Sequence, residues 1–218
     1  MRIAMLGTGI VGRALAAELA RRGDEVVLGT RDASQPHSEE LAELLGEHST
    51  ITLRSFADAV TDAELVVLAI GGDHALDVIA AAGPDALDGK VLIDLSNPLD
   101  FSNGYPPTLS VCNTTSLGEQ IQTAAPGARV VKTLNTVNVA VMTDPAGVGA
   151  GEHDLFLCGN DEGAKRHVEA FLAERFGWQS FLDLGDITMA RGTEMYMPLW
   201  LRVRAALGTS NFNVRVVR

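Results

Sequence analysis

The chain begins with a short apolar run that leads directly into three glycines, and this feature constrains its fold more than any other. The run Ile3–Leu6 precedes the string Gly7-Thr8-Gly9-Ile10-Val11-Gly12, and a series of good helix formers follows. A strand, a GxGxxG turn and a helix in this order are typical of a dinucleotide-binding sheet. Gly7 allows the tight turn, Gly9 lets the backbone approach a pyrophosphate, and Gly12 lets helix and strand pack closely. The free N–H groups of the helix's first turn would face the phosphates.

The end of the second expected strand, residues 25–29, indicates which dinucleotide binds. NAD-binding units carry a carboxylate there, which bonds the ribose 2′-OH. Gly29 cannot do so, whereas the following Thr30 and Arg31 suit a 2′-phosphate, to which a guanidinium can donate two parallel bonds. We therefore expect NADP(H). The alternative is that Arg31 is a solvated loop residue and that Asp32 supplies the acid.

The charge of the chain argues against two classes of partner. Its 218 residues carry a formal net charge of −11, whereas nucleic acids and anionic membranes require clustered Lys and Arg. The longest apolar run, Leu65–Ile70, is too short to span a membrane and is expected to form a strand. Since the first strand starts at Arg2, we expect no signal or transit peptide and a cytoplasmic protein. Cys112 and Cys158 have neither disulfide-type nor metal-type spacing, so we expect idle thiols and no metal site.

Apolar runs of four to six residues alternate with helical patterns, which predicts an α/β fold with a doubly wound, mostly parallel sheet of the Rossmann type. The expected strands are 2–6, 25–29, 50–53, 65–70, 91–95, 130–134, 154–158 and 179–182. The expected helices are 11–22, 38–46, 55–61, 73–82, 115–125 and 161–176. Ser55, Asp73 and Asp161 are predicted to begin helices, and Gly177 to end one.

The last segment breaks this alternation. We expect an NADP-binding domain over residues 1–185 and a small helical cap and tail over 186–218. Within the cap, Asp186–Leu207 reads as helix, with Pro198 forcing a kink or a new start. Apolar and polar residues alternate along the tail Phe212–Val217, which is predicted to add an edge strand.

Ligands of a doubly wound sheet lie outside the carboxyl ends of its strands. The predicted cofactor-binding residues follow from those ends: Gly7, Thr8, Gly9, Ile10, Val11, Gly12, Thr30, Arg31, Ala69, Ile70, Gly71, Asn97 and Pro98. The end of the sixth strand, Lys132–Asn138, is unusually polar and is expected to bind an acceptor over the nicotinamide ring. The walls of that cleft are expected to come from Gly71-Gly72, Asn97-Pro98, Asn135-Thr136 and the helical segment around Met195 to Trp200. Asn135, as a donor to a ring carbonyl, and Thr136 are the predicted catalytic residues.

Two titratable residues near these strand ends leave their roles open. His74 titrates near neutrality, but an imidazole at the start of a helix is more commonly solvated or linked to the cap. Lys132 is either a proton donor or, more commonly, an ion-pair partner of an acidic neighbour. No nucleophile elbow or HExxH motif is visible. Hydride transfer to another redox ring needs little such machinery, because the cofactor carries the chemistry.

Taken in order, several segments resemble the NADPH-dependent reductases of the deazaflavin coenzyme F-420 (hereafter F420). The segments are Gly7–Gly12, Gly29–Arg31, Ile70–Ala75, Val130–Thr136 and Ala190–Arg202. The resemblance implies that Thr8, Ile10, Thr30 and Arg31 hold NADPH, and that the sixth strand end faces the deazaflavin. The chain departs from the family pattern, which has His and Pro at the positions of Asn135 and Asn138. The form found here is closer to the flavin-using domains of membrane metalloreductases.

The leading hypothesis is therefore an oxidoreductase that moves hydride between NADP(H) and F420, with FMN or FAD as other acceptors. A second hypothesis is the NADPH-dependent reduction of a small imine or carbonyl compound, as in pyrroline-carboxylate reductases. A third is a non-catalytic NADP-binding sensor. The sequence also leaves a homodimer open.

Overall fold

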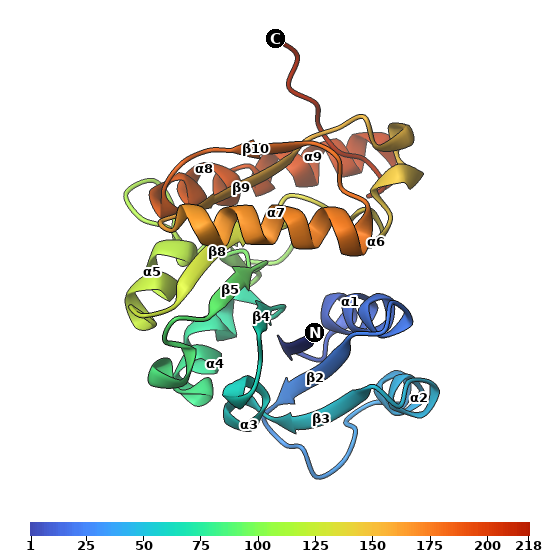
Figure 1. The fold of residues 1–218 in the computed structure, drawn as a ribbon. Coiled ribbons are helices and arrows are strands. Elements are labelled where there is room, and N and C mark those ends of the chain that lie inside the picture. The colour runs from blue at the N-terminus through green and yellow to red at the C-terminus, as the bar shows by residue number, and fades with distance from the viewer.

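A computed structural model describes residues 1–218, which form one eight-stranded sheet covered by helices on both faces (Figure 1). The strands lie side by side in the order β10-β9-β8-β5-β4-β1-β2-β3, and every neighbouring pair is parallel except β8–β9. In chain order they are β1 (Arg2–Leu6), β2 (Glu25–Thr30), β3 (Ile51–Ser55), β4 (Leu65–Leu68), β5 (Val91–Asp94), β8 (Arg129–Thr133), β9 (Leu155–Gly159) and β10 (Phe181–Asp183). The predicted doubly wound, mostly parallel sheet is confirmed.

Two apolar cores, one on each face, hold the helices on the sheet. The larger core has 29 buried residues and the smaller 23. The larger lies beneath α1 (Ile10–Arg21), α2 (Glu39–Glu47), α6 (Val139–Thr143) and α7 (Glu162–Phe176). The smaller lies beneath α3 (Phe56–Thr61), α4 (Ala75–Ala82), α5 (Leu117–Ala124) and α8 (Ala190–Met195). Because both faces are buried, β4 is apolar along its whole length and β5 is apolar up to its last residue, Asp94.

Local capping chemistry accounts for most helix boundaries. The Ser55 hydroxyl accepts the Asp58 N–H at 3.1 Å, and the Asp161 carboxylate accepts the Ala164 N–H at 2.6 Å, as predicted. Gly177 ends α7 in the left-handed conformation. The predicted cap at Asp73 is wrong, because the chain first makes a 3-10 turn over Gly72–His74 and α4 begins only at Ala75.

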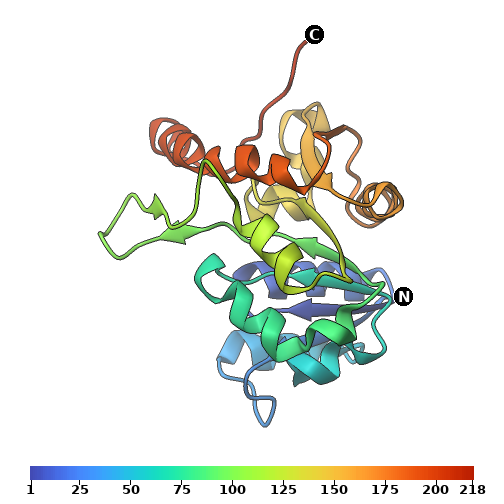
Figure 2. The same cartoon turned by 90° about the vertical axis from the view of Figure 1, so that its left-hand side faces the viewer.

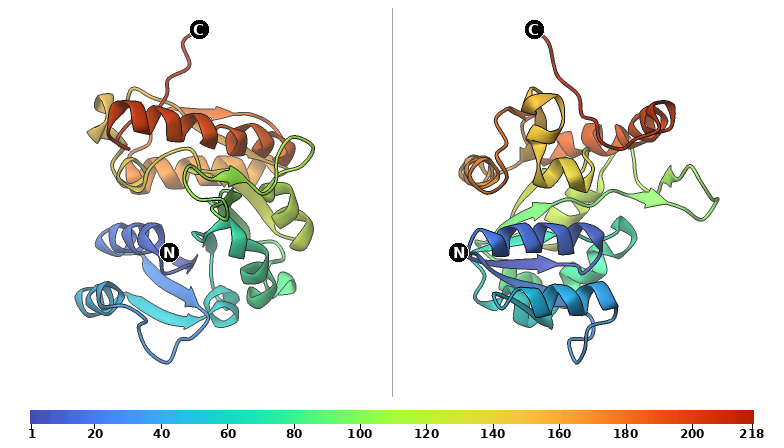
Figure 3. Two further views of the ribbon diagram at one scale, coloured as in Figure 1. Left: turned by 180° about the vertical axis from the view of Figure 1, so that it is seen from behind. Right: turned by 90° about the vertical axis from the view of Figure 1, so that its right-hand side faces the viewer.

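A small hairpin after β5 was not predicted. Strands β6 (Leu99–Asp100) and β7 (Thr108–Leu109) pair antiparallel, and their connecting loop projects from the body of the protein (Figure 2). Each strand has only two residues, too few to produce a recognisable alternation. The helix α9 (Met197–Leu207) lies beside this hairpin (Figure 3, left). Pro198 occupies the first turn of α9, so the predicted new start of the helix is confirmed.

The predicted edge strand in the C-terminal tail is wrong. The Phe212 ring stacks on Trp200, with 5.3 Å between ring centroids, and beyond it the tail leaves the body (Figure 1). The backbone of the tail bonds to one residue rather than along a strand: the Asp154 N–H donates to the Val214 carbonyl, and the Val216 N–H donates to the Asp154 carboxylate. No helix of the chain has the length and apolarity that crossing a membrane requires.

Candidate functional site

Three adjoining cavities open where the carboxyl ends of the parallel strands meet. β4 lies on the opposite side of β1 from β2, so the strand order reverses here, which is where doubly wound sheets bind ligands. A ribose pocket of about 250 Å³ lies at the end of β2, around Thr30 and Arg31. A central chamber of about 500 Å³ follows at the ends of β1 and β4. An acceptor chamber of about 340 Å³ lies beyond it, around Asn135 and Trp200, and shares Ile10 and Met142 with the central chamber.

The structure brings most of the predicted cofactor residues to this cleft. The ribose pocket is lined by Gly7, Thr8, Thr30, Arg31 and Ile70, and the central chamber by Gly9, Ile10, Val11, Ala69, Ile70, Gly71 and Asn97. Gly12 and Pro98 line neither cavity. Pro98 is buried, and its carbonyl accepts the Ser110 N–H at 2.9 Å.

The three glycines of the turn have different roles. A Cβ on Gly7, whose φ is +127°, would lie 2.3 Å from the Ala69 carbonyl oxygen, and one on Gly12 would lie 2.1 Å from the Gly7 oxygen. These two glycines are therefore required by backbone packing. A Cβ on Gly9 would meet nothing within 4 Å. Its missing side chain leaves space in the central chamber, at the point where α1 begins.

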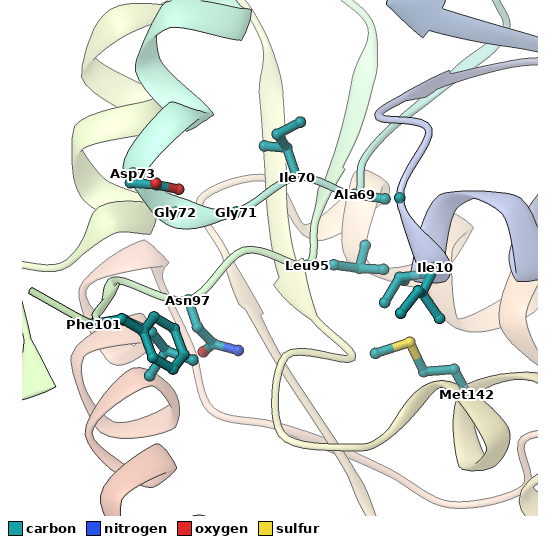
Figure 4. Close-up of a pocket in the computed structure, with 13 residues that line it drawn as sticks. Ile10, Ala69, Ile70, Gly71, Gly72, Asp73, Leu95, Asn97, Phe101 and Met142 are labelled. Atoms are coloured by element: carbon teal, nitrogen blue, oxygen red, sulfur yellow. The ribbon is translucent and has the colours of Figure 1, made fainter. Parts of the chain in front are cut away.

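The start of α1 fits a pyrophosphate. Gly9 caps the helix without a side chain, and no acidic residue occupies the first turn. The first N–H groups of a helix have no partner within it, so they remain able to bind phosphate oxygens. The Arg13 guanidinium donates to the Thr8 carbonyl at 2.9 Å and braces the turn. Ile10, 71% exposed, lies with Leu95 and Met142 around one end of the chamber (Figure 4).

The ribose pocket corrects one step of the sequence argument. A Cβ on Gly29 would meet the side chains of Leu6 and Phe56 at 2.9 and 3.0 Å, so position 29 faces the core rather than the cleft. Because side chains alternate along β2, Thr30 faces the pocket instead. Neither position carries a carboxylate. Arg31 and Asp32 both line the pocket. Arg31 forms no ion pair, whereas the exposed Asp32 carboxylate accepts the Ser34 N–H, so Arg31 is the more available of the two.

Asn97 and Asn135 form a reciprocal pair that joins the ends of β5 and β8. The Asn97 side-chain amide donates to the Asn135 carbonyl at 2.8 Å, and the Asn135 amide donates to Asn97 Oδ1 at 3.0 Å. Asn135 is 3% exposed, and its Oδ1 is buried with no partner. One of the two amide hydrogens of Asn135 is thus engaged, while the second hydrogen and Oδ1 have no partner. Thr136, also buried, lines the acceptor chamber beside it.

Comparisons with known proteins agree with this geometry. The sequence profile of the family described as NADP oxidoreductase, coenzyme F420-dependent, matches residues 2–98. A protein from Arthrobacter sp. FB24, whose crystal structure is described as that of a candidate F420-dependent NADP reductase, is 50% identical; the match covers 100% of both chains, with a TM-score of 0.96. The chain belongs to the coenzyme F420-dependent NADP oxidoreductase family.

Two further relatives match more than nine tenths of this chain. The F420-dependent NADP reductase of Methanothermobacter marburgensis is 27% identical over 99% of this chain and 98% of its own length. Metalloreductase STEAP3 of Rattus norvegicus is 27% identical over 91% of this chain, but the match spans only 38% of that longer protein. The resemblance predicted from the sequence is confirmed, and the protein is an NADP-dependent oxidoreductase.

The far wall of the acceptor chamber is formed by the C-terminal helical segment expected there from the sequence, but Arg204, one turn further along, was not anticipated. Met197, Trp200 and Arg204 of α9 line it, opposite the segment Val137–Val139. Arg204 is the only charged residue among the lining residues. On the sequence an arginine in a helix resembles any solvated cation, so no local signal distinguishes Arg204.

Lys132 belongs to a buried ion network rather than to the cleft. Its ammonium lies 2.9 Å from both Asp94 and Glu194 and 2.6 Å from the Ser96 carbonyl. Burial alone would lower the pKa of Lys132, but attraction to the two carboxylates outweighs this effect and raises it. The ammonium therefore stays charged, and of the two roles left open the ion pair is the one observed. Glu194, which comes from α8, was not predicted.

The remaining titratable candidates stand apart from the cleft. His74 is exposed, lies 3.6 Å from the Asp73 carboxylate and lines none of the three cavities. Burial raises the pKa of Cys158 to about 12, so its thiol stays protonated and unreactive. Cys112 is exposed and forms no disulfide.

Proposed function

We propose that the protein transfers hydride between NADP(H) and the deazaflavin ring of coenzyme F420. One observation carries the proposal: no carboxylate, imidazole or ammonium lines the acceptor chamber, whose walls include Val137, Val139, Met142 and Trp200. Hydride transfer between two rings depends on close, aligned placement and needs little acid–base machinery from the protein. A chamber without an acid–base side chain suits that demand.

Different residues of the cleft would hold different parts of the dinucleotide. Thr30 and Arg31 would hold the 2′-phosphate, and the first N–H groups of α1 the pyrophosphate. A nicotinamide held there would supply the hydride, and a proton from solvent would complete the reduction of the acceptor ring. Ile10 and Met142, which line both chambers, would exclude water from the reacting faces. Asn135 would donate the second hydrogen of its amide to a carbonyl of the acceptor ring.

The other hypotheses have weaker support from this geometry. Reduction of an imine or carbonyl compound benefits from a positioned proton donor, and the acceptor chamber has no side chain of that kind. A non-catalytic sensor would not need a second chamber beside an unpartnered buried hydrogen-bond acceptor, Asn135 Oδ1. FMN and FAD also present flat rings, so they are compared directly in the experiment below. The homodimer and the cytoplasmic location expected from the sequence stay predictions.

Stopped-flow oxidation of NADPH with F420, FMN, FAD and a cyclic imine tests the proposal. We expect rapid oxidation with F420 and much slower oxidation with the other three. Oxidation by the imine alone, or faster oxidation by FMN or FAD than by F420, would contradict it.

Two variants test the role of Asn135. Asn135→Ala removes the bond to Asn97 and the whole side-chain amide. Asn97→Ala breaks the same bond, and also the bond to the Asn135 carbonyl, but keeps the Asn135 amide. Loss of one buried hydrogen bond corresponds to about tenfold. We expect kcat of Asn135→Ala to fall about tenfold below that of Asn97→Ala. Equal turnover of the two variants would assign Asn135 a purely structural role.

A further inference from the structure

Two arginines line the cleft, and they stand at its opposite ends. Arg31 lines the ribose pocket and Arg204 the acceptor chamber. The chain has 28 Asp and Glu against 17 Lys and Arg, yet neither of these two arginines forms an ion pair. In so acidic a protein, a cation that lines a cavity without an acidic partner favours an anionic ligand.

The acceptor chamber continues outward past Arg204. A second, shallower hollow of about 450 Å³ is lined by Arg204, Ala205 and Gly208 at the end of α9 and by Tyr105 of the hairpin loop. The Arg204 guanidinium donates to the Tyr105 hydroxyl at 3.5 Å, the outer limit of a hydrogen bond. Arg204 thus stands at the junction between the acceptor chamber and a shallower outer groove.

A cation in the last turn of a helix also interacts favourably with the helix dipole. That effect explains an arginine near the end of α9 but not its place at the junction of two cavities. Arg202, on the same helix, is exposed, forms no ion pair and lines neither cavity. It provides a matched control of equal charge.

We infer that Arg204 binds the anionic tail of a ring-shaped acceptor. The ring enters the acceptor chamber, and a phosphate or carboxylate on its side chain pairs with the guanidinium and runs out along the groove toward Tyr105. Arg204 would then distinguish tailed acceptors from the bare ring, as Arg31 distinguishes NADPH from NADH. This inference rests on the proposed function, because F420 carries both a phosphate and carboxylates on its side chain.

Equilibrium binding to the enzyme–NADP⁺ complex, followed by deazaflavin fluorescence, tests the inference without turnover. Three probes separate the sources of charge: F420, its phosphorylated parent without carboxylates, and the uncharged parent deazaflavin. For the wild type we expect the tailed probes to bind about tenfold more tightly than the uncharged parent, with an advantage that shrinks as salt is raised. Which tailed probe gains most identifies phosphate or carboxylate as the group recognised.

In Arg204→Ala the ratio of the Kd of the uncharged parent to the Kd of the tailed probes should fall about three- to tenfold. Arg204→Lys should keep part of this ratio. Arg202→Ala should leave it unchanged. An equal effect of Arg202→Ala, or a wild type that does not distinguish the probes, would overturn the inference while NADPH oxidation by F420 still supports the proposed function. Tail-dependent binding through Arg204 without NADPH oxidation would overturn the proposed function alone. Failure of all three probes to bind would overturn both.

Discussion

Glu194 ties the C-terminal helices to the sheet, and its replacement by Gln should destabilise the protein while leaving NADPH binding intact. The carboxylate is 1% exposed. It accepts the Leu117 and Gly118 N–H groups at 2.8 and 2.9 Å and lies 2.9 Å from the Lys132 ammonium. Gln keeps one oxygen but turns an NH₂ group toward a donor, and Lys132 is left with Asp94 alone.

The expected loss is about 2–4 kcal/mol, from one weakened buried ion pair and one buried N–H left without an acceptor. For a chain of this size each kcal/mol lowers Tm by about 2–4 °C, so Tm should fall by about 5–15 °C in calorimetry. Since α9 follows α8 and walls the acceptor chamber, the KM for the acceptor should rise while the Kd for NADPH stays constant.

Glu119→Gln is the matched control for this experiment. Glu119 also joins α5 to α8, through a two-bond ion pair with Arg191, but this pair is partly exposed. It should contribute less than about 1 kcal/mol. If Glu194→Gln melts within 2 °C of the control (about 1 kcal/mol or less), the buried network is not what holds the C-terminal helices.

Three further changes have expected outcomes. Arg31→Ala should weaken NADPH binding about tenfold and leave NADH binding unchanged in titration calorimetry; equal losses would show a structural role. Gly9→Val should abolish nucleotide binding with a near-wild-type melt, because a Cβ there meets no atom of the protein; a collapsed melt would refute this reading. Burial alone would raise the pKa of Asp24, but its bonds to Arg175 and the N-terminal ammonium lower it below 3.8. The contribution of Asp24 to the free energy of unfolding is therefore present above pH 4 and lost as pH falls through the lowered pKa. In urea unfolding, Asp24→Asn should lower this free energy by about 2 kcal/mol at pH 7 and by much less near pH 3. A cost independent of pH would contradict this.

The sequence by itself determined the features that depend on close neighbours along the chain. The glycine turn, the apolar strands and the caps at Ser55 and Asp161 each follow from a few consecutive residues, and the structure has them where they were expected. Alternation of strands and helices then leaves few topologies, so the doubly wound sheet followed as well. The misplaced cap at Asp73 and the missed hairpin are elements of two to four residues, too short for any periodic pattern.

Only the tertiary structure decided which atoms face the cleft. The pleat of β2 turned position 29 into the core and Thr30 toward the pocket, and pairing with Asn97 engaged one of the two amide hydrogens of Asn135. Glu194 and Arg204 carried no local signal, because their partners come from segments far apart in the sequence. Hydrogen bonds and cavities depend on distances in space, and folding sets those distances through contacts that no window of sequence contains.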